Sequence, residues 1–270
     1  MDKGAILITG AGSGLGFALT HVLTQAGYHV FAGVRDISVQ YELPDDVEII
    51  QLDVTCASQV MEAAAAIKAS GRYVRAIINN AGVYAGGPIE HMPAANIQRV
   101  FEVNFMGALN VTRAFLPILR EQRGGQIHMV SSLSGLLGLP GDGIYAASKH
   151  ALEAATESLS LEVTPWDIKV VLLELGAYAT NLMKNQPEQD LTVPYQGMVS
   201  TPEETGEHPP VIEAAEEILS IIDNVPTRLR YQIGQQAKTV WKFLDRTSQE
   251  ARRDFIVAAS NTENWVKKKL

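Results

Sequence analysis

The sequence is poor in cysteine, in positive charge and in long apolar runs, and each shortage excludes a class of protein. Its single cysteine, Cys56, cannot form an intrachain disulfide, which fits a reducing compartment. The 22 Lys and Arg residues against 30 Asp and Glu give a net charge of −8, which argues against nucleic acid as the main partner. No apolar run reaches the roughly 18 residues of a membrane span, and the N-terminal segment turns glycine-rich before a signal peptide could develop. We therefore expect a cytoplasmic protein with no membrane span.

Histidines are also few and scattered. None of the six belongs to an HExxH pattern or to a closely spaced pair, so we predict no metal site. What the chain does have is ordinary for a soluble enzyme: 46% hydrophobic residues, 22 glycines and 12 prolines in 270 residues. This composition excludes a disordered or low-complexity chain and leaves enough apolar material for one large core.

Short apolar, β-branched segments alternate with longer helical patterns, which is typical of βαβ units with a parallel sheet. The expected strands cover residues 5–9, 29–34, 47–52, 76–79, 126–131, 169–175 and 229–233. The expected helices cover residues 15–26, 57–69, 94–122 and 145–167. The sequence therefore predicts a single α/β domain, built on a Rossmann-type doubly wound parallel sheet of about seven strands. Helices cover both faces, and the ligand crevice lies beyond the C-terminal ends of the strands.

The regular alternation stops after the sixth expected strand. Residues 177–211 form a polar, proline-containing stretch that starts at a strand C-terminus, where ligand sites open. We expect a substrate lid there, with a linker between domains as the alternative. Residues 212–270 then read as a C-terminal helical part that includes the last strand, in the same domain as the core of residues 4–180.

A glycine-rich loop joins the first strand to the first helix, in the order Thr9-Gly10-Ala11-Gly12-Ser13-Gly14-Leu15-Gly16. The missing side chains let the backbone approach a pyrophosphate, and the helix N-terminus supplies free N–H donors and a positive dipole. The spacing is GxxxGxG and differs from the common GxGxxG fingerprint. The loop indicates a dinucleotide site, and a tight turn without a ligand is the alternative.

The residues after the second strand bear on the type of dinucleotide. Arg35 follows Val34 at the strand end, and a guanidinium makes a paired contact with a 2′-phosphate that no carboxylate offers. This favours NADP(H) over NAD(H). Asp36 comes next and would make the preference mixed if it turned toward the ribose, and Arg35 as a plain surface charge is the other alternative.

A tyrosine and a lysine stand four residues apart, at Tyr145 and Lys149, near the start of an expected helix. Residues i and i+4 share a helix face, so the phenol and the ammonium lie close together. Ser132 ends the fifth strand and can converge on them. Hydride transfer to a carbonyl leaves an alkoxide that needs a proton, and a neighbouring cation lowers the pKa of a phenol, which suits Tyr145 for that exchange.

These motifs occur in the order TGxxxGxG, Asp53-Val54, Asn79-Asn80-Ala81-Gly82, Asn104, Ser132 and Tyr145-x-x-x-Lys149. In this order the sequence resembles the classical short-chain dehydrogenase/reductase (SDR) family over residues 4–180. The resemblance implies that Tyr145 is the general acid/base and that Ser132 orients the substrate carbonyl or hydroxyl. It also implies that Lys149 binds the nicotinamide ribose and depresses the pKa of Tyr145, while Asn104 anchors a water in a proton relay.

The resemblance further implies a set of cofactor contacts. Adenine would meet Asp53 and the Val54 backbone, and the pyrophosphate and adenosine ribose would meet Gly10, Ser13, Leu15 and Gly16. The ribose would also run along Asn80, Ala81 and Gly82. One motif departs from the family pattern: the segment Gly176-Ala177-Tyr178-Ala179-Thr180 lacks the proline that usually precedes its glycine. The cofactor contacts expected at Gly176, Tyr178 and Thr180 therefore rest on a partial match.

The expected substrate is a small apolar alcohol or carbonyl compound bound at Ser132 and Tyr145. The loop between these residues is rich in leucine and carries no cluster of basic side chains. The alternative is that these leucines only pack the loop itself. The segment 31–36 resembles the steroid and retinol dehydrogenase branch of the family. The rival reading is a non-catalytic NADP(H)-sensing regulatory protein. The helices expected at 94–122 and 145–167 resemble the pair through which family members form dimers or tetramers, and small residues on the second permit close approach, which implies a homodimer or homotetramer. The alternative is that the apolar helical tail covers this surface.

Overall fold

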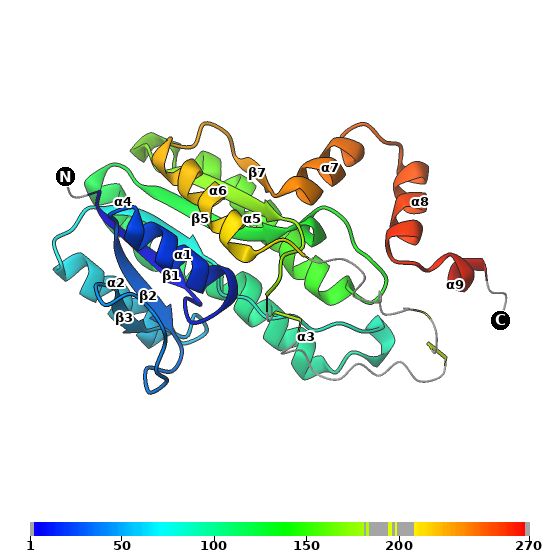
Figure 1. The fold of residues 1–270 in the computed structure, drawn as a ribbon, viewed down its shortest axis with the longest axis horizontal. Helices are drawn as coiled ribbons and strands as arrows, with labels where there is room; N and C mark the ends of the chain where they lie inside the picture. Colours follow the sequence, from blue (N-terminus) through cyan, green and yellow to red (C-terminus); the bar gives the residue numbers. More distant parts are fainter. Residues whose placement is uncertain (1–2, 181, 184–193, 196–197, 199–207, 268–270) are drawn as a thin grey trace.

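Seven strands form one parallel sheet in the order β3-β2-β1-β4-β5-β6-β7, which confirms the predicted doubly wound arrangement (Figure 1). The structure is a computed structural model that describes residues 3–180, 182–183, 194–195, 198 and 208–267. The chain first runs outward from β1 to β3 and then returns past β1 to β4, so the strand order reverses between β1 and β4. The strands are β1 (Ala5–Thr9), β2 (His29–Val34), β3 (Glu48–Gln51), β4 (Val74–Asn79), β5 (Gln126–Ser132), β6 (Lys169–Leu175) and β7 (Arg230–Ile233).

Helices cover both faces of the sheet because strand side chains alternate between the faces. On β1, Ala5 and Leu7 join one apolar core, whereas Ile6 and Ile8 join the other. The first core packs against α2 (Ala57–Ala69), α4 (Ala108–Gln122) and α5 (Gly143–Glu162). The second packs against α1 (Gly14–Gln25) and α6 (Val211–Asp223). The buried cores fix the sheet, so its C-terminal edge is a rigid base for a site.

Two predicted helices differ from the structure. The helix expected over residues 94–122 is divided into α3 (Ala94–Phe101), a π-helical turn η2 (Glu102–Gly107) and α4. The helix expected over residues 145–167 begins at Gly143 and gives way to a 3-10 turn, η4 (Thr164–Trp166). Single π-helical turns within helices are frequent at functional sites, and Asn104 lies in the middle of this one.

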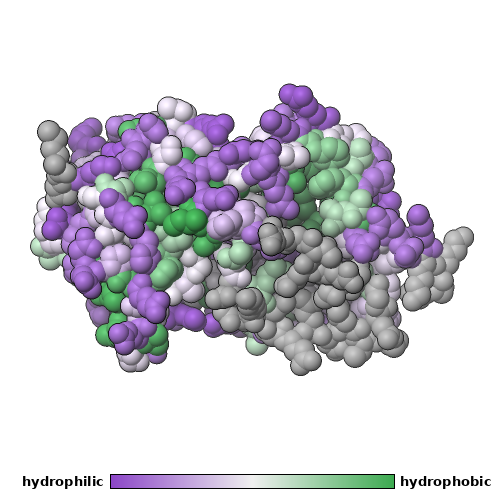
Figure 2. All heavy atoms as spheres, viewed as in Figure 1, coloured by the Kyte–Doolittle hydropathy of each residue, from purple (hydrophilic) through white to green (hydrophobic). Residues whose placement is uncertain are grey.

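The C-terminal part extends away from the sheet as α7 (Gln235–Leu244), α8 (Gln249–Ala259) and α9 (Glu263–Lys267) (Figure 1). Figure 2 shows apolar side chains on this C-terminal part. The rings of Phe243 on α7 and Phe255 on α8 lie 4.8 Å apart. Most of the stretch expected as a substrate lid, 177–211, lies outside the described residues. Among the residues that the structure describes, no helix is both long and apolar enough to cross a membrane.

Candidate active site

The glycine-rich loop connects β1 to α1 at the C-terminal edge of the sheet. Gly10 and Gly14 have φ of 67° and 54°, a left-handed backbone that favours glycine. Ser13 is the N-cap residue of α1, and its side chain makes no capping hydrogen bond. The first N–H groups of the helix are therefore not capped by this hydroxyl, as a phosphate-binding helix terminus requires.

Close packing at Gly16 holds the loop in shape. A Cβ atom at this position would collide with the Gly10 carbonyl oxygen and come within 2.7 Å of Asn80 Nδ2. Asn80 Nδ2 donates to the Thr9 carbonyl oxygen at 2.8 Å, and the backbone N–H of Ala81 donates to Thr9 Oγ1 at 2.9 Å. The residues predicted to follow the ribose thus also tie the end of β4 to the glycine loop.

Arg35 and Asp36 follow β2, and their side chains have different surroundings. Arg35 is exposed. Asp36 Oδ1 accepts hydrogen bonds from the backbone N–H and the hydroxyl of Ser38, at 2.9 and 2.6 Å, and these bonds lower the pKa of Asp36. The Asp36 carboxylate is therefore engaged in its own turn, whereas the Arg35 guanidinium is open to an incoming anion.

Asp53 and Val54 lie just beyond β3. Burial opposes ionisation of Asp53, but hydrogen bonds from Thr55 and the positive charges of Arg35 and Arg99 lower its pKa overall. Asp53 Oδ1 accepts both the N–H and the hydroxyl of Thr55, at 2.9 and 2.7 Å. The Val54 side chain is buried against Gly107, next to the π-helical turn. This pair therefore forms a fixed wall on the β3 side of the sheet edge.

Ser132 and Tyr145 meet on the β5 side of the glycine loop, opposite the β3 side described above. Ser132 ends β5, and its Oγ accepts the N–H of Ser134 at 3.1 Å. Tyr145 lies in the first turn of α5, is only 7% exposed, and is hydrogen-bonded by the Ser132 side chain. The structure thus brings together the two hydroxyls that the sequence predicted to converge.

Lys149 lies one turn after Tyr145 on α5. Its Nζ is 5.7 Å from the centroid of the Tyr145 ring and donates to the Val130 carbonyl oxygen at 2.7 Å. Burial lowers the pKa of Lys149 to about 8, although the negative charge of Glu153 opposes this. A cation therefore lies beside the phenol at the end of β5, as the YxxxK spacing predicted.

Asn104 holds the π-helical turn against its neighbours. It is 1% exposed; its Oδ1 accepts the Val83 N–H at 2.8 Å, and its Nδ2 donates to the Val83 carbonyl oxygen at 2.9 Å. The same Nδ2 lies 3.1 Å from Ser148 Oγ, next to Lys149. Asn104 thus links the loop after β4 to α5, and the four predicted catalytic residues come together at one place.

The ionisation of Tyr145 differs from the sequence prediction. Burial and the negative charge of Asp142 raise the pKa of Tyr145, and the hydrogen bond from Ser132 offsets only part of this increase. Burial and a nearby carboxylate therefore oppose the lowering of the pKa of Tyr145 that was expected from Lys149.

The segment after β6 reaches two different neighbours. A Cβ at Gly14 would be 3.6 Å from Thr180 Cβ, so Thr180 lies beside the glycine loop, as predicted. Tyr178 instead packs its hydroxyl against Gly234, after β7. The backbone N–H of Gly176 donates to the Ile233 carbonyl oxygen at 3.1 Å, which continues the pairing with β7. Only Thr180 of these three is shown beside the predicted cofactor loop.

Sequence reasoning missed two residues of the catalytic side. Tyr84 follows the Asn-Asn-Ala-Gly segment, and its ring centroid is 5.1 Å from that of Tyr145. Asp142 is a buried carboxylic acid three residues before Tyr145. Their positions in the sequence, directly beside two recognised motifs, were the available signal. Neither residue type is by itself diagnostic, so only the fold shows that they face Tyr145.

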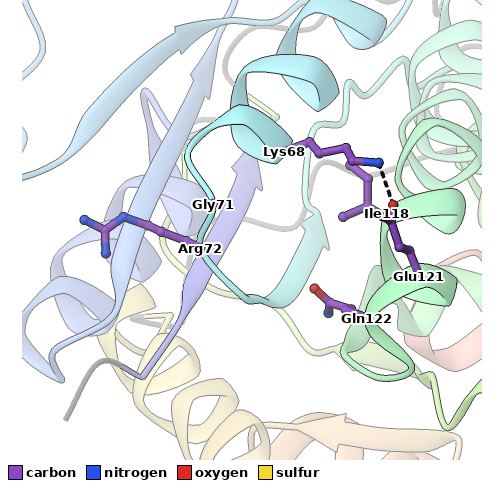
Figure 3. Close-up of a pocket in the computed structure, with 6 residues that line it drawn as sticks. All are labelled: Lys68, Gly71, Arg72, Ile118, Glu121 and Gln122. Carbon is purple, nitrogen blue, oxygen red and sulfur yellow. Dashed lines mark hydrogen bonds and ion pairs between the residues drawn. The ribbon is translucent and has the colours of Figure 1, made fainter.

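A separate hollow lies far from these residues in the fold, between α2, the following turn and the end of α4 (Figure 3). Lys68 and Glu121 are ion-paired across it at 2.5 Å, and both side chains are more than half exposed. It contains none of the predicted site residues. No group of three or more His, Cys, Asp or Glu side chains in the described part of the chain is arranged to hold a metal ion.

Known proteins are similar to this chain in sequence and in fold. Residues 4–191 match the family model described as short chain dehydrogenase. Retinol dehydrogenase 8 of Bos taurus is 34% identical over 203 residues, which are 71% of this chain and 64% of the relative. A short chain dehydrogenase from Burkholderia cenocepacia in complex with NADP is 26% identical, with a TM-score of 0.80, over 95% of this chain and 98% of that one. A family member from Burkholderia phymatum in complex with NAD is also 26% identical, with a TM-score of 0.76, over 100% and 98% of the two chains.

Proposed function

Because the chain belongs to the short-chain dehydrogenase family, we propose that it interconverts a ketone or aldehyde and an alcohol on an apolar substrate, using NADP(H). The observation that supports this most is the convergence of Ser132, Tyr145 and Lys149 at the end of β5, on the same sheet edge as the glycine loop. A hydride donor and a proton donor must both reach one carbon–oxygen bond, and this edge offers a place for each.

The residues of the first half of the sheet fit a dinucleotide. A Cβ at Gly16 would collide with the Gly10 backbone, so only glycine allows this tight loop. The hydroxyl of Ser13, the N-cap residue of α1, makes no capping hydrogen bond. We infer that NADP(H) is preferred over NAD(H), because Arg35 is exposed while Asp36 is held by Ser38. Gly10, Ser13, Leu15 and Gly16 would hold the pyrophosphate, with Asp53 and Val54 at adenine and Asn80–Gly82 along the ribose.

A nicotinamide cofactor held by the glycine loop would supply the hydride that the substrate carbonyl carbon receives. Ser132 donates a hydrogen bond to the substrate oxygen and orients it toward Tyr145. Tyr145 then gives its phenolic proton to that oxygen, which completes the alcohol, and takes a proton back in the reverse direction. Lys149 places a positive charge beside the phenol as its negative charge develops. Asn104 fixes the π-helical turn that packs against α5.

The loop between β5 and α5 supports the proposed substrate class. Leu137 is buried in this loop, and Arg252 from α8 donates to the Leu136 carbonyl oxygen at 3.1 Å, which ties the C-terminal part to the same region. A leucine-rich loop suits an apolar compound better than a phosphate or carboxylate, and the Arg252 guanidinium on this loop is engaged with a backbone carbonyl. The name of the retinol dehydrogenase relative is consistent with such a substrate.

We also propose that the protein is a homodimer or homotetramer. Along α5 the small side chains of Ala147 and Ala154 are exposed, and Leu161 is 75% exposed, which suits close approach of a second copy. Size-exclusion chromatography with light scattering tests this, and a monomer at all concentrations would contradict it. A cytoplasmic location stays a prediction.

The experiment that tests the function is a nicotinamide absorbance assay over steroid, retinoid, aliphatic and aromatic carbonyls, with NADPH and NADH in parallel. We expect turnover of an apolar carbonyl, a higher kcat/KM with NADPH, and a loss of activity in Tyr145→Phe. In Arg35→Ala the preference for NADPH should fall while turnover with NADH persists. Tight NADPH binding with no turnover of any carbonyl would favour the non-catalytic regulatory protein instead.

A further inference from the structure

Asp142 occupies the N-cap position of α5, yet its side chain makes no capping hydrogen bond there. Aspartate at this position usually accepts a backbone N–H of the first helical turn. Here the carboxyl is buried, 8% exposed, and its Oδ2 accepts the Ser134 hydroxyl at 2.7 Å. The side chain has therefore been directed away from the helix end, toward the catalytic side.

Three elements hold Asp142 in this position. Ser134 belongs to η3 (Leu133–Gly135), directly after Ser132. The hydroxyl of Tyr84, from the loop after β4, also stabilises the ionised carboxyl. The backbone N–H of Asp142 donates to the Leu139 carbonyl oxygen at 3.0 Å. Contacts from separate segments thus fix one carboxyl beside the catalytic phenol.

Within the described residues, the titratable groups that interact with Asp142 are the phenols of Tyr84 and Tyr145. Tyr84 packs against Tyr145 with ring centroids 5.1 Å apart and an angle of 59° between the rings. Burial raises the pKa of Asp142 to about 6, against the hydrogen bonds from Ser134 and Tyr84. Lys149, the nearest catalytic cation along α5, donates to Val130 and interacts with Glu153. Above neutral pH, Asp142 therefore adds a negative charge next to Tyr145.

We propose that Asp142 is a positioning residue for proton transfer: its carboxyl, held by Ser134 and Tyr84, keeps the phenol of Tyr145 in its protonated form. This rests on the proposed role of Tyr145 as the general acid/base. In carbonyl reduction the Tyr145 O–H bond breaks, a new O–H bond forms on the substrate oxygen, and a phenolate remains. Repulsion from Asp142 disfavours that phenolate, so the phenol is retained to more alkaline pH and the reverse reaction needs more alkaline pH.

Two variants separate the charge of Asp142 from its structural contacts. Asp142→Asn removes the charge and keeps an acceptor for Ser134, whereas Ser134→Ala keeps the charge and removes that hydrogen bond. If Asp142→Asn does not fold, as judged by circular dichroism, Asp142→Ser is the second neutral variant. Two readouts apply to each: the pH dependence of kcat/KM for alcohol oxidation, and the NMR resonance of isotope-labelled tyrosine Cζ, assigned to Tyr145 with Tyr145→Phe.

In Asp142→Asn we expect both midpoints to fall by about one pH unit, so that oxidation below the midpoint is about tenfold faster than in the wild type. In Ser134→Ala the alkaline midpoint should stay where it is, because the carboxylate is ionised there in either protein. Unchanged midpoints in Asp142→Asn, or equal shifts in both variants, would overturn the proposal. Full activity in Tyr145→Phe would instead contradict the proposed mechanism, and the NMR midpoint would still report on Asp142.

Discussion

The two halves of the sheet, one built from β1 to β4 and the other from β5 to β7, bury different kinds of polar side chain. From β1 to β4, the buried polar side chains in the described residues carry no carboxyl, amine or imidazole group. From β5 to β7 the buried side chains include five that do: His128, Asp142, Lys149, Glu153 and Glu174. The proposed cofactor side is thus built by shape and backbone donors, and the proposed catalytic side by enclosed ionisable groups.

This difference has an energetic cost on one side only. An enclosed charge stabilises the fold only when it is paired and hydrogen-bonded. Arg230 on β7 lies 3.3 Å from Glu153 and 3.4 Å from Glu174, with its guanidinium also 3.2 Å from Glu157. Gln232 adds a hydrogen bond of 2.7 Å to Glu174. One arginine therefore compensates the acids that lie behind Lys149.

Removing that arginine should have the largest effect on the fold. In Arg230→Met the carboxylates of Glu153 and Glu174 lose their cation, which should lower the free energy of unfolding by about 3–5 kcal/mol. Urea denaturation measures it, with Lys169→Met as the control, since Lys169 pairs with the exposed Asp167.

The deficit should also shrink as pH falls. Burial already raises the pKa of Glu174 to about 7, above its unfolded value, so the folded state takes up protons and gains stability toward acid pH. A loss under about 1 kcal/mol in Arg230→Met, equal to that of an exposed pair, would remove the distinction between the two sides.

On the cofactor side, the largest effect should come from adding one carbon atom. Gly16→Ala places a Cβ against Gly10 and Asn80, which should cost about 1–3 kcal/mol of stability. NADPH affinity, measured by calorimetry, should fall by about tenfold or more because the loop must move. Gly138→Ala is the matched control, since its Cβ would meet only Ala146 Cβ at an ordinary 3.9 Å. Unchanged affinity in Gly16→Ala would show that the loop shape does not determine binding.

A pH effect should distinguish β5 from the apolar strands. His128 is fully buried, and burial, with the charge of Arg75, lowers its pKa to about 3. Below about pH 6.5, the pKa of an unfolded histidine, His128 binds a proton in the unfolded chain but not in the folded protein. The free energy of unfolding therefore decreases as the pH decreases, by up to about 1.4 kcal/mol per pH unit. In His128→Gln this slope should disappear between about pH 6.5 and 4.5. If the urea midpoints of the wild type and of His128→Gln changed equally with pH over this range, the burial of a neutral imidazole at His128 would be contradicted.

The smallest effect is expected at the surface hollow of Figure 3. The Lys68–Glu121 pair is short, but its side chains are 57% and 66% exposed. Lys68→Met should therefore change the free energy of unfolding by less than about 1 kcal/mol, and this change should weaken with added salt. A larger loss would mean that exposed pairs matter as much as the buried network of Arg230.

Local patterns were sufficient to predict the sheet and most of the site. The predicted strands begin and end within two residues of the observed ones, because several of them are apolar on both faces and are bounded by turn residues. The glycine loop, Ser132, Tyr145 and Lys149 were found by spacing, since the chemistry needs those residue types at those positions. The seven-stranded parallel sheet with helices on both faces is confirmed.

What the sequence could not predict depends on contacts between distant segments. The π-helical turn at Asn104 is accompanied by hydrogen bonds to Val83, twenty-one residues away. The raised pKa of Tyr145 depends on the burial of its phenol and on the negative charge of Asp142 beside it. The periodicity of residues 94–122 predicts one helix, and the YxxxK spacing contains no information on burial or on Asp142, so neither the π-helical turn nor the raised pKa of Tyr145 could be predicted.

The central claim is that the cofactor side binds and that Tyr145 on the other side performs the proton transfer. The most direct test is single-turnover reduction of an apolar carbonyl by the preformed NADPH complex of Tyr145→Phe, alongside its NADPH affinity. We expect an affinity within about twofold of the wild type and a reduction rate lower by about 10²–10⁴. Reduction at the wild-type rate by this variant would contradict it.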